Sequence, residues 1–317
     1  MGNKLEQYYI FPAIAEKCSE YLQLQLKKGA YEKFSDPKTF ADAVTNDLRE
    51  VSKDKHMTFD LLEELSVKQI EKTKKIIYST PDLVESDEYK SYEYKSDHFE
   101  EFSYEVKSGR LENDPTIGYL DLRTMGICKT GDKDSYEVKK DGDERRTAFI
   151  KAVEKLKGTK SIIIDLRNNG GGKPNAVQLL CSLFMEEKSH LDGIEWRKGD
   201  FYQIDAWDTL PYEDLPKETR LLEQKVVILI SPNTFSAAES CANSMRASKK
   251  GTMIVGERSG GGVANPGGYE PIGKYFDIRI PSGRAINPHQ EGNWEGIGII
   301  PDHEVSAKDA LNMAISL

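Results

Sequence analysis

Apolar side chains recur every three or four positions over the first quarter of the chain. One such stripe covers residues 12–26 and begins with a proline, which suits the first turn of a helix. A second covers residues 40–51 and follows Ser35-Asp36-Pro37, a start signal in which a capping side chain precedes a proline. The pattern favours a third helix over residues 61–77. We therefore expect a small helical bundle over residues 1–78.

The pattern changes after residue 115, where short apolar runs alternate with helical stripes. Five segments are predicted as strand, helix, strand, helix and strand in turn: 117–122, 145–156, 161–166, 175–185 and 226–230. Strands that alternate with helices favour an α/β core with parallel pairing. We assign this core to residues 116–317.

Two stretches fall outside this alternation. Residues 79–115 form a charged connecting segment, with a strand expected over 102–106 and a turn near Gly109. Residues 191–223 carry several aromatic side chains and interrupt the core. A long insert of this kind forms either the wall of a site or an edge hairpin.

Composition and charge narrow the class of protein. The 317 residues include 44 basic and 53 acidic side chains, which give a net charge of −9. This charge argues against a protein that binds the phosphates of a nucleic acid. No apolar run approaches the ~18 residues of a membrane span. No signal-peptide pattern opens the chain, which fits a cytoplasmic protein or an exported one whose signal has been removed. The four cysteines are widely spaced, so we expect reduced thiols and neither a metal nor another cofactor.

Ser236 is the first candidate for chemistry. It follows the apolar run 226–230 and a turn, and it opens a segment of small residues that begins a helix. Free N–H groups at a helix start can hold the oxyanion that forms when a serine attacks a carbonyl. The alternative is a simple helix cap, for which serine is among the commonest residues.

A nucleophilic serine needs backbone donors and a base. The glycine runs 170–172 and 260–262 let the backbone approach a ligand closely, although plain tight turns explain them equally well. Of the five histidines, His56 and His289 lie near carboxylates and are nearly tied as candidate bases. No histidine pair has the spacing of a zinc protease.

Five segments resemble, in order, motifs of the C-terminal processing (tail-specific) protease family. They are DLRNNGGG at 165–172, NTFSAAES at 233–240, GERSGGG at 256–262, IPSGRAINP at 280–288 and NWEGIGIIPD at 293–302. The likeness is greatest to the branch that contains the tricorn protease core and the modules of interphotoreceptor retinoid-binding protein. It implies a ClpP/crotonase-like α/β core with an N-terminal helical bundle and no PDZ domain.

The resemblance also assigns the reacting groups. It implies that Ser236 is the nucleophile, with Glu239 beside it. The N–H groups of Gly171 and Ala237 would form the oxyanion hole. The resemblance thus turns an isolated serine into a site with named donors.

The base follows from the branch of the family. The processing-protease branch carries a lysine after the GE turn, where this chain has Gly261-Gly262-Val263. The tricorn branch uses a histidine and a distant glutamate, which His56 and Glu295 match. That branch has a serine just before the histidine, whereas this chain has Lys55, so the orientation of His56 stays open.

The function implied is a serine-type peptidase that hydrolyses peptides or protein C-terminal regions through an acyl-enzyme on Ser236. Its substrate would contact Gly261 and Gly262. Arg258 or Arg284 would hold a terminal carboxylate, and each is equally consistent with a structural ion pair. The rival function is a non-catalytic binding module for an apolar, retinoid- or fatty acid-like ligand. The expected partner is a peptide or unfolded protein, with the oligomeric state left open.

Overall fold

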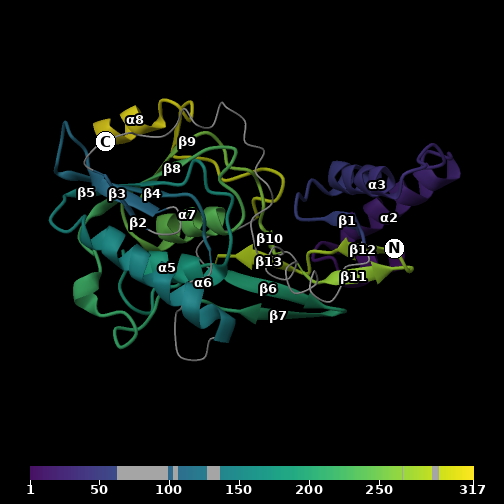
Figure 1. Cartoon of the computed structure of the whole chain (residues 1–317), viewed down its shortest axis with the longest axis horizontal. Helices are drawn as coiled ribbons and strands as arrows, with labels where there is room; N and C mark the ends of the chain where they lie inside the picture. Colours follow the sequence, from purple (N-terminus) through teal and green to yellow (C-terminus); the bar gives the residue numbers. More distant parts are fainter. Residues whose placement is uncertain (63–98, 103–105, 127–135, 266, 288–292) are drawn as a thin grey trace.

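The main body of the protein is built on one seven-stranded sheet (Figure 1). The computed structural model describes residues 1–62, 99–102, 106–126, 136–265, 267–287 and 293–317. The strands run in the order β14 (His303–Glu304), β9 (Met253–Gly256), β8 (Lys225–Ile230), β5 (Ser161–Asp165), β4 (Ile117–Leu122), β3 (Val106–Arg110) and β2 (Glu100–Phe102). From β14 to β4 the neighbours are parallel, and β3 and β2 are antiparallel. This confirms the predicted α/β core.

The central strands are apolar throughout because both faces of the sheet are covered. Ile162 and Ile164 of β5 belong to a large core, while Ile163 between them belongs to a smaller core on the other face. The large core includes side chains of α5 (Tyr136–Glu154), α6 (Pro174–Ser182) and α7 (Ala237–Ser248). The smaller core includes side chains of α8 (Ala310–Ser316).

Two smaller sheets extend the core toward the N-terminal helices. One has the order β10 (Ala264–Asn265), β13 (Gly283–Ile286), β6 (Gly193–Lys198) and β7 (Phe201–Asp205). The other has the order β1 (Thr58–Leu61), β12 (Phe276–Arg279) and β11 (Tyr269–Ile272). The aromatic insert therefore includes an antiparallel hairpin, β6–β7, followed by the short 3₁₀ helix η2 (Lys217–Thr219).

The N-terminal helices α1 (Gly2–Tyr8), α2 (Pro12–Lys27) and α3 (Pro37–Ser52) lie beside the three-stranded sheet (Figure 1). Asp36 caps α3 by accepting the Thr39 N–H at 2.8 Å, as its sequence predicts. These helices share a core with Ile278 and Ile280, which come from late in the chain. This packing fixes the loop after α3 against the α/β core.

Several predicted elements need correction. Leu61 ends strand β1 and does not begin a helix, Leu62 is not helical either, and residues 63–77 of the predicted helix lie outside the described residues. Gly109 lies inside β3 and pairs with Tyr119, and the turn predicted near it follows a few residues later, over residues 112–116. The helix predicted over 145–156 exists but begins earlier, as part of α5. Within the part of the chain that the structure describes, no helix is long and apolar enough to cross a membrane.

Candidate active site

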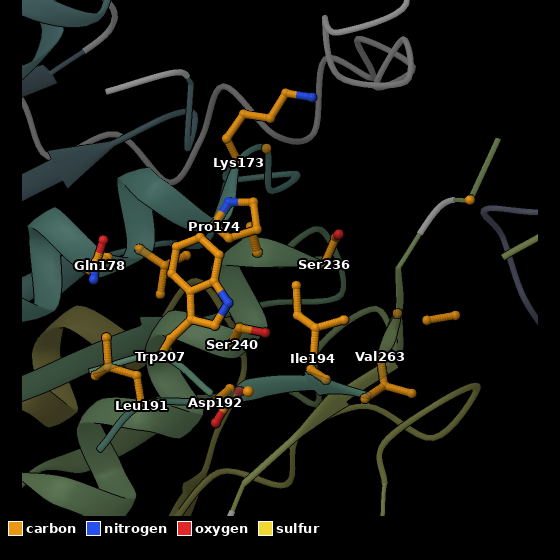
Figure 2. Close-up of a pocket in the computed structure, with 18 of the residues that line it drawn as sticks. Lys173, Pro174, Gln178, Leu191, Asp192, Ile194, Trp207, Ser236, Ser240 and Val263 are labelled. Carbon is orange, nitrogen blue, oxygen red and sulfur yellow. The ribbon is translucent and has the colours of Figure 1, made fainter. Parts of the chain in front are cut away.

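Ser236 lies between strand β8 and helix α7 in a strained backbone conformation. Its φ is 53° and its ψ is −120°, a combination of backbone angles that residues other than glycine rarely adopt. The backbone on both sides is held: the Phe235 N–H donates to the Asn169 carbonyl at 3.1 Å, and the Ser236 N–H donates to Glu239 Oε2 at 2.8 Å. The serine is therefore fixed at the helix start with its hydroxyl directed at a cavity (Figure 2).

Glu239 is fully buried, and both of its carboxylate oxygens accept hydrogen bonds. Oε2 accepts the N–H groups of Ser236 and Gly262, each at 2.8 Å. Oε1 accepts the Gly261 N–H at 2.9 Å and the Ser259 hydroxyl. Burial raises the pKa of Glu239, and these four donors oppose that rise. Glu239 thus joins the serine turn to the glycine turn, and the Gly261 and Gly262 N–H groups are used within the protein.

His56 approaches Ser236 from the loop after α3. Its Nε2 lies 3.2 Å from Ser236 Oγ, across 180 residues of sequence. The imidazole stacks on the Phe235 ring at a centroid distance of 4.7 Å. Gly262 permits this approach, because a Cβ there would clash with the Phe235 ring and lie 3.0 Å from His56 Cε1. The distance between His56 and Ser236 suits proton transfer.

Asp54 lies on the other side of the imidazole and was missed by the sequence reasoning. Its Oδ1 accepts the His56 backbone N–H at 2.9 Å and lies 3.3 Å from His56 Nδ1, which has no hydrogen-bond partner among the described residues. Its Oδ2 accepts the Tyr9 hydroxyl at 3.0 Å, and Asp54 itself has no exposed surface. Burial and the charge of Asp54 raise the pKa of Tyr9 well above its usual range. The only signal in the sequence was the aspartate two positions before the histidine.

Glu295, the predicted partner of His56, lies further back. Its Oε2 accepts the Ala264 N–H at 2.7 Å, while its buried Oε1 has no hydrogen-bond partner among the described residues. Burial, and then the charge of Asp54, raise the pKa of Glu295 to about 9. We therefore expect Glu295 to be protonated at pH 7, because the nearby negative charge of Asp54 disfavours its ionised form. In the described part of the chain, Glu295 makes no hydrogen bond to His56. The alternative base, His289, lies outside the described residues.

Gly171 and Ala237 come together at the start of α7, as the sequence suggested. A Cβ on Gly171, whose φ is 101°, would lie 2.9 Å from the Ala237 nitrogen, so only glycine fits. The Ala237 N–H has no acceptor among the described residues. The Gly171 N–H, however, donates to Asn169 Oδ1 at 2.9 Å, so only one of the two predicted donors is free.

A cavity of about 320 Å³ opens beside Ser236 (Figure 2). Its apolar wall comes from helix α6 and the aromatic insert: Val177, Leu191, Ile194 and Trp207. The insert is therefore both an edge hairpin and part of the wall of the cavity. Lys173, Arg279 and Asp192 also line it, and sequence reasoning singled out none of them.

The two predicted arginines lie elsewhere. Arg258 Nε is 3.9 Å from Glu304, and Arg284 Nε donates to Glu195 at 2.7 Å. Neither lines the cavity. The positive charge at the cavity comes instead from Lys173 and Arg279. The pKa of Lys173 is lowered to about 8 by burial and then by the charge of Arg279.

A serine held at a helix start, with a histidine within reach of its hydroxyl and an aspartate beside that histidine, is the arrangement of a serine-nucleophile hydrolase. The chain belongs to peptidase family S41: the model described as "Peptidase family S41" matches residues 116–305. A second model, the "N-terminal domain of Peptidase_S41 in eukaryotic IRBP", matches residues 1–94. The chain therefore belongs to a family of peptidases, and its resemblance to tail-specific and tricorn-like proteases is confirmed.

Individual relatives agree with this assignment. A "Probable CtpA-like serine protease" of Staphylococcus haemolyticus (strain JCSC1435) is 25% identical over 221 residues. That match covers 66% of this chain and 41% of the relative, so the chain spans less than half the length of that protein.

Solved structures share the fold at low identity. A crystal structure from Parabacteroides merdae ATCC 43184 has a TM-score of 0.67 at 18% identity, covering 99% of this chain and 93% of that one. The photosystem II D1 C-terminal processing protease has a TM-score of 0.53 at 14% identity, covering 96% and 91%. The tricorn protease has a TM-score of 0.52 at 13% identity, covering 98% of this chain and 34% of tricorn.

Proposed function

We propose that this chain hydrolyses peptide bonds through an acyl-enzyme on Ser236, with His56 as the base. One observation carries the proposal: His56 Nε2 lies 3.2 Å from Ser236 Oγ while Asp54 lies beside the opposite ring nitrogen. A histidine between a hydroxyl and a buried carboxylate can remove the hydroxyl proton during attack and return it to the leaving amine.

Asp54 has the role that the sequence assigned to Glu295. The carboxylate charge, 3.3 Å from Nδ1, favours the tautomer with the proton on Nδ1 and leaves Nε2 to accept the Ser236 proton; because Nδ1 has no hydrogen-bond partner among the described residues, its bond to Asp54 would form as the imidazolium develops. It also stabilises the imidazolium that forms. Tyr9 in turn orients Asp54 through the hydrogen bond to Oδ2. Glu295 supports this group from behind in its neutral form and holds the strand that begins at Ala264.

The oxyanion would lie at the start of helix α7. The Ala237 N–H is ready to donate, because it has no acceptor among the described residues. The second donor that we propose is the Gly171 N–H, which must leave Asn169 Oδ1 when substrate binds. Losing one oxyanion donor typically costs ~100-fold or more in rate. The Gly171 N–H must therefore be released from Asn169 before the site reaches full activity.

The substrate that we propose is a peptide or the C-terminal region of a protein. Family membership supports this choice, as does a cavity large enough for a side chain beside Ser236. The names of the relatives point the same way, since one is a CtpA-like protease and another a C-terminal processing protease.

A fluorophosphonate probe tests the nucleophile. The folded protein should be labelled at Ser236, and Ser236→Ala should abolish both labelling and peptide hydrolysis. His56→Ala should abolish hydrolysis as well, with His289→Ala as the matched control. Turnover that survives in His56→Ala and disappears in His289→Ala would show that the base is wrongly assigned.

The apolar wall of the cavity also suits the rival function, a binding module for a retinoid- or fatty acid-like ligand. Trp207 lines that wall, so binding of such a ligand should quench tryptophan fluorescence. Quenching by retinol or a fatty acid, together with no fluorophosphonate labelling, would favour the binding module over the peptidase.

A further inference from the structure

Lys55 lies immediately before His56 in the loop that joins helix α3 to strand β1. Its side chain is exposed, yet its ammonium group makes two contacts with the α/β core. Nζ donates a hydrogen bond to the Gly260 carbonyl at 3.0 Å, across 205 residues of sequence. It also lies 5.4 Å from the centroid of the Phe235 ring, within the range of a cation–π interaction. One ammonium group therefore contacts both the glycine turn and the residue before Ser236.

The loop that carries His56 has few other ties to the core. Among the described residues, the remaining hydrogen bonds of residues 53–57 stay within residues 1–62, apart from the contact between His56 and Ser236. The bond from the His56 N–H to Asp54 is one of these internal bonds, so it moves with the loop. Within the described ranges, the Lys55 bond is thus the one hydrogen bond that ties this loop to the core without using the reacting groups themselves.

The Gly260 end of this bond is firmly held. The Gly260 N–H donates to the Thr234 carbonyl at 2.8 Å, and a Cβ on this glycine would lie 2.8 Å from the Phe235 ring. The next two N–H groups of the glycine turn donate to Glu239. The glycine turn is therefore fixed to the serine turn, and a donor bound to the Gly260 carbonyl is fixed relative to the nucleophile.

The Phe235 ring, the second contact of Lys55, also carries the imidazole of His56. The two rings stack at a centroid distance of 4.7 Å and an interplanar angle of 28°. Because His56 Nδ1 has no hydrogen-bond partner among the described residues, this stacking has a large share in setting the plane of the imidazole. A cation is attracted to the face of an aromatic ring. Lys55 therefore helps to hold the ring on which the imidazole rests.

We propose that Lys55 is a positioning residue for His56. Its ammonium group ties the loop after α3 to the glycine turn and to the Phe235 ring. This keeps His56 Nε2 within reach of Ser236 Oγ. The inference rests on the function proposed above, in which His56 is the base. The tricorn branch has a serine at the position of Lys55, so the family pattern does not supply this contact.

Two substitutions of Lys55 test this role in steady-state hydrolysis of one fluorogenic peptide. Lys55→Met removes the ammonium group and keeps a stem of similar length, whereas Lys55→Arg keeps a cation that can donate to the Gly260 carbonyl. A displacement of about 1 Å can cost ~100-fold in rate, but water replaces part of an exposed hydrogen bond, so we expect Lys55→Met to lower kcat about tenfold. KM should stay within about twofold, because Lys55 is not among the described residues that line the cavity. Lys55→Arg should recover most of the lost kcat.

Lys33→Met is the matched control. Lys33 is also exposed, and its ammonium group lies 5.1 Å from the centroid of the Phe34 ring, but it belongs to the connection between α2 and α3. This variant should keep the wild-type kcat, and both methionine variants should unfold at about the wild-type temperature. If kcat of Lys55→Met stays within about twofold of the wild type, or if Lys55→Arg loses as much as Lys55→Met, the role is overturned. A raised KM with unchanged kcat would also overturn it, since Lys55 would then contact substrate.

Crystal structures of the wild type and Lys55→Met separate this inference from the peptidase proposal, because they need no turnover. In the variant, His56 Nε2 should lie beyond hydrogen-bond reach of Ser236 Oγ, more than about 3.5 Å away. An imidazole in the wild-type position would overturn the role of Lys55 even if kcat falls. A displaced imidazole, in a protein whose wild type neither hydrolyses peptides nor reacts with fluorophosphonate, would support the role of Lys55 and overturn only the peptidase function.

Discussion

Replacing Glu295 by glutamine distinguishes two roles for the carboxyl group behind His56. If Glu295 is an ionised partner of His56, glutamine removes a charge that catalysis needs. If it is neutral, glutamine is a close mimic of the protonated acid. The structure favours the neutral form, because burial and the charge of Asp54 raise its pKa to about 9.

The expected magnitude follows from that pKa. At pH 7 the group lies below its pKa, so most molecules carry the proton on Glu295. Glu295→Gln should therefore keep kcat/KM within about threefold of the wild type at pH 7. As pH rises through about 9, the wild type ionises a second carboxylate close to Asp54 and should lose activity, whereas the variant should not.

Stability, like activity, is expected to fall in the wild type as pH rises. The folded protein holds a proton on Glu295 that the unfolded chain releases near pH 4.5, its ordinary pKa. Stability therefore falls as pH rises from that value through about 9 in the wild type, and the fall should be smaller in Glu295→Gln. The assays are kcat/KM and thermal unfolding of both proteins from pH 6 to pH 10. A loss of about 1,000-fold or more for the variant at pH 7 would refute the neutral form and restore Glu295 as the charged partner.

Three further changes test the remaining parts of the site. Asp54→Asn should lower kcat by about 10⁴-fold in steady-state assays, the loss known when the aspartate of a Ser-His-Asp site is replaced. A loss under tenfold would exclude Asp54 as the partner of His56. Gly262→Ala should reduce activity ~100-fold or more in the same assay, because the added methyl group clashes with Phe235 and lies against the His56 ring. Asp192→Asn should gain stability relative to the wild type as pH rises from 3.8 to about 7, where the folded protein keeps a proton that the unfolded chain releases. The gain should approach about 4 kcal/mol above pH 7, and calorimetry showing no pH-dependent difference would contradict it.

The sequence predicted the core and the nucleophile because both are encoded locally. Strands β4, β5 and β8 are apolar at nearly every position, since helices cover both faces of the sheet, and this pattern needs no knowledge of distant contacts. Ser236 was found because a strand, a turn and a helix start are adjacent in the chain.

The surroundings of Ser236 could be predicted only in part, because they depend on contacts between distant segments. Family resemblance supplied His56, but Asp54 was overlooked because the family pattern directs attention to Glu295. The orientation of Asp54 depends on Tyr9, which is 45 residues away. Asp192, Lys173 and Arg279 come from three separate elements, so no single motif marks the cavity that they line.

The buried carboxyl groups near Ser236 differ in how many of their oxygens accept hydrogen bonds from the protein. Glu239 has donors on both oxygens, and removing it would separate the serine turn from the glycine turn. Asp192 and Glu295 each keep one buried oxygen without a partner among the described residues, and each has a raised pKa. Such groups destabilise the free protein, so a fold that retains them gains something other than stability. For Glu295 that gain is a neutral acid beside Asp54, which leaves the charge of Asp54 to act on His56.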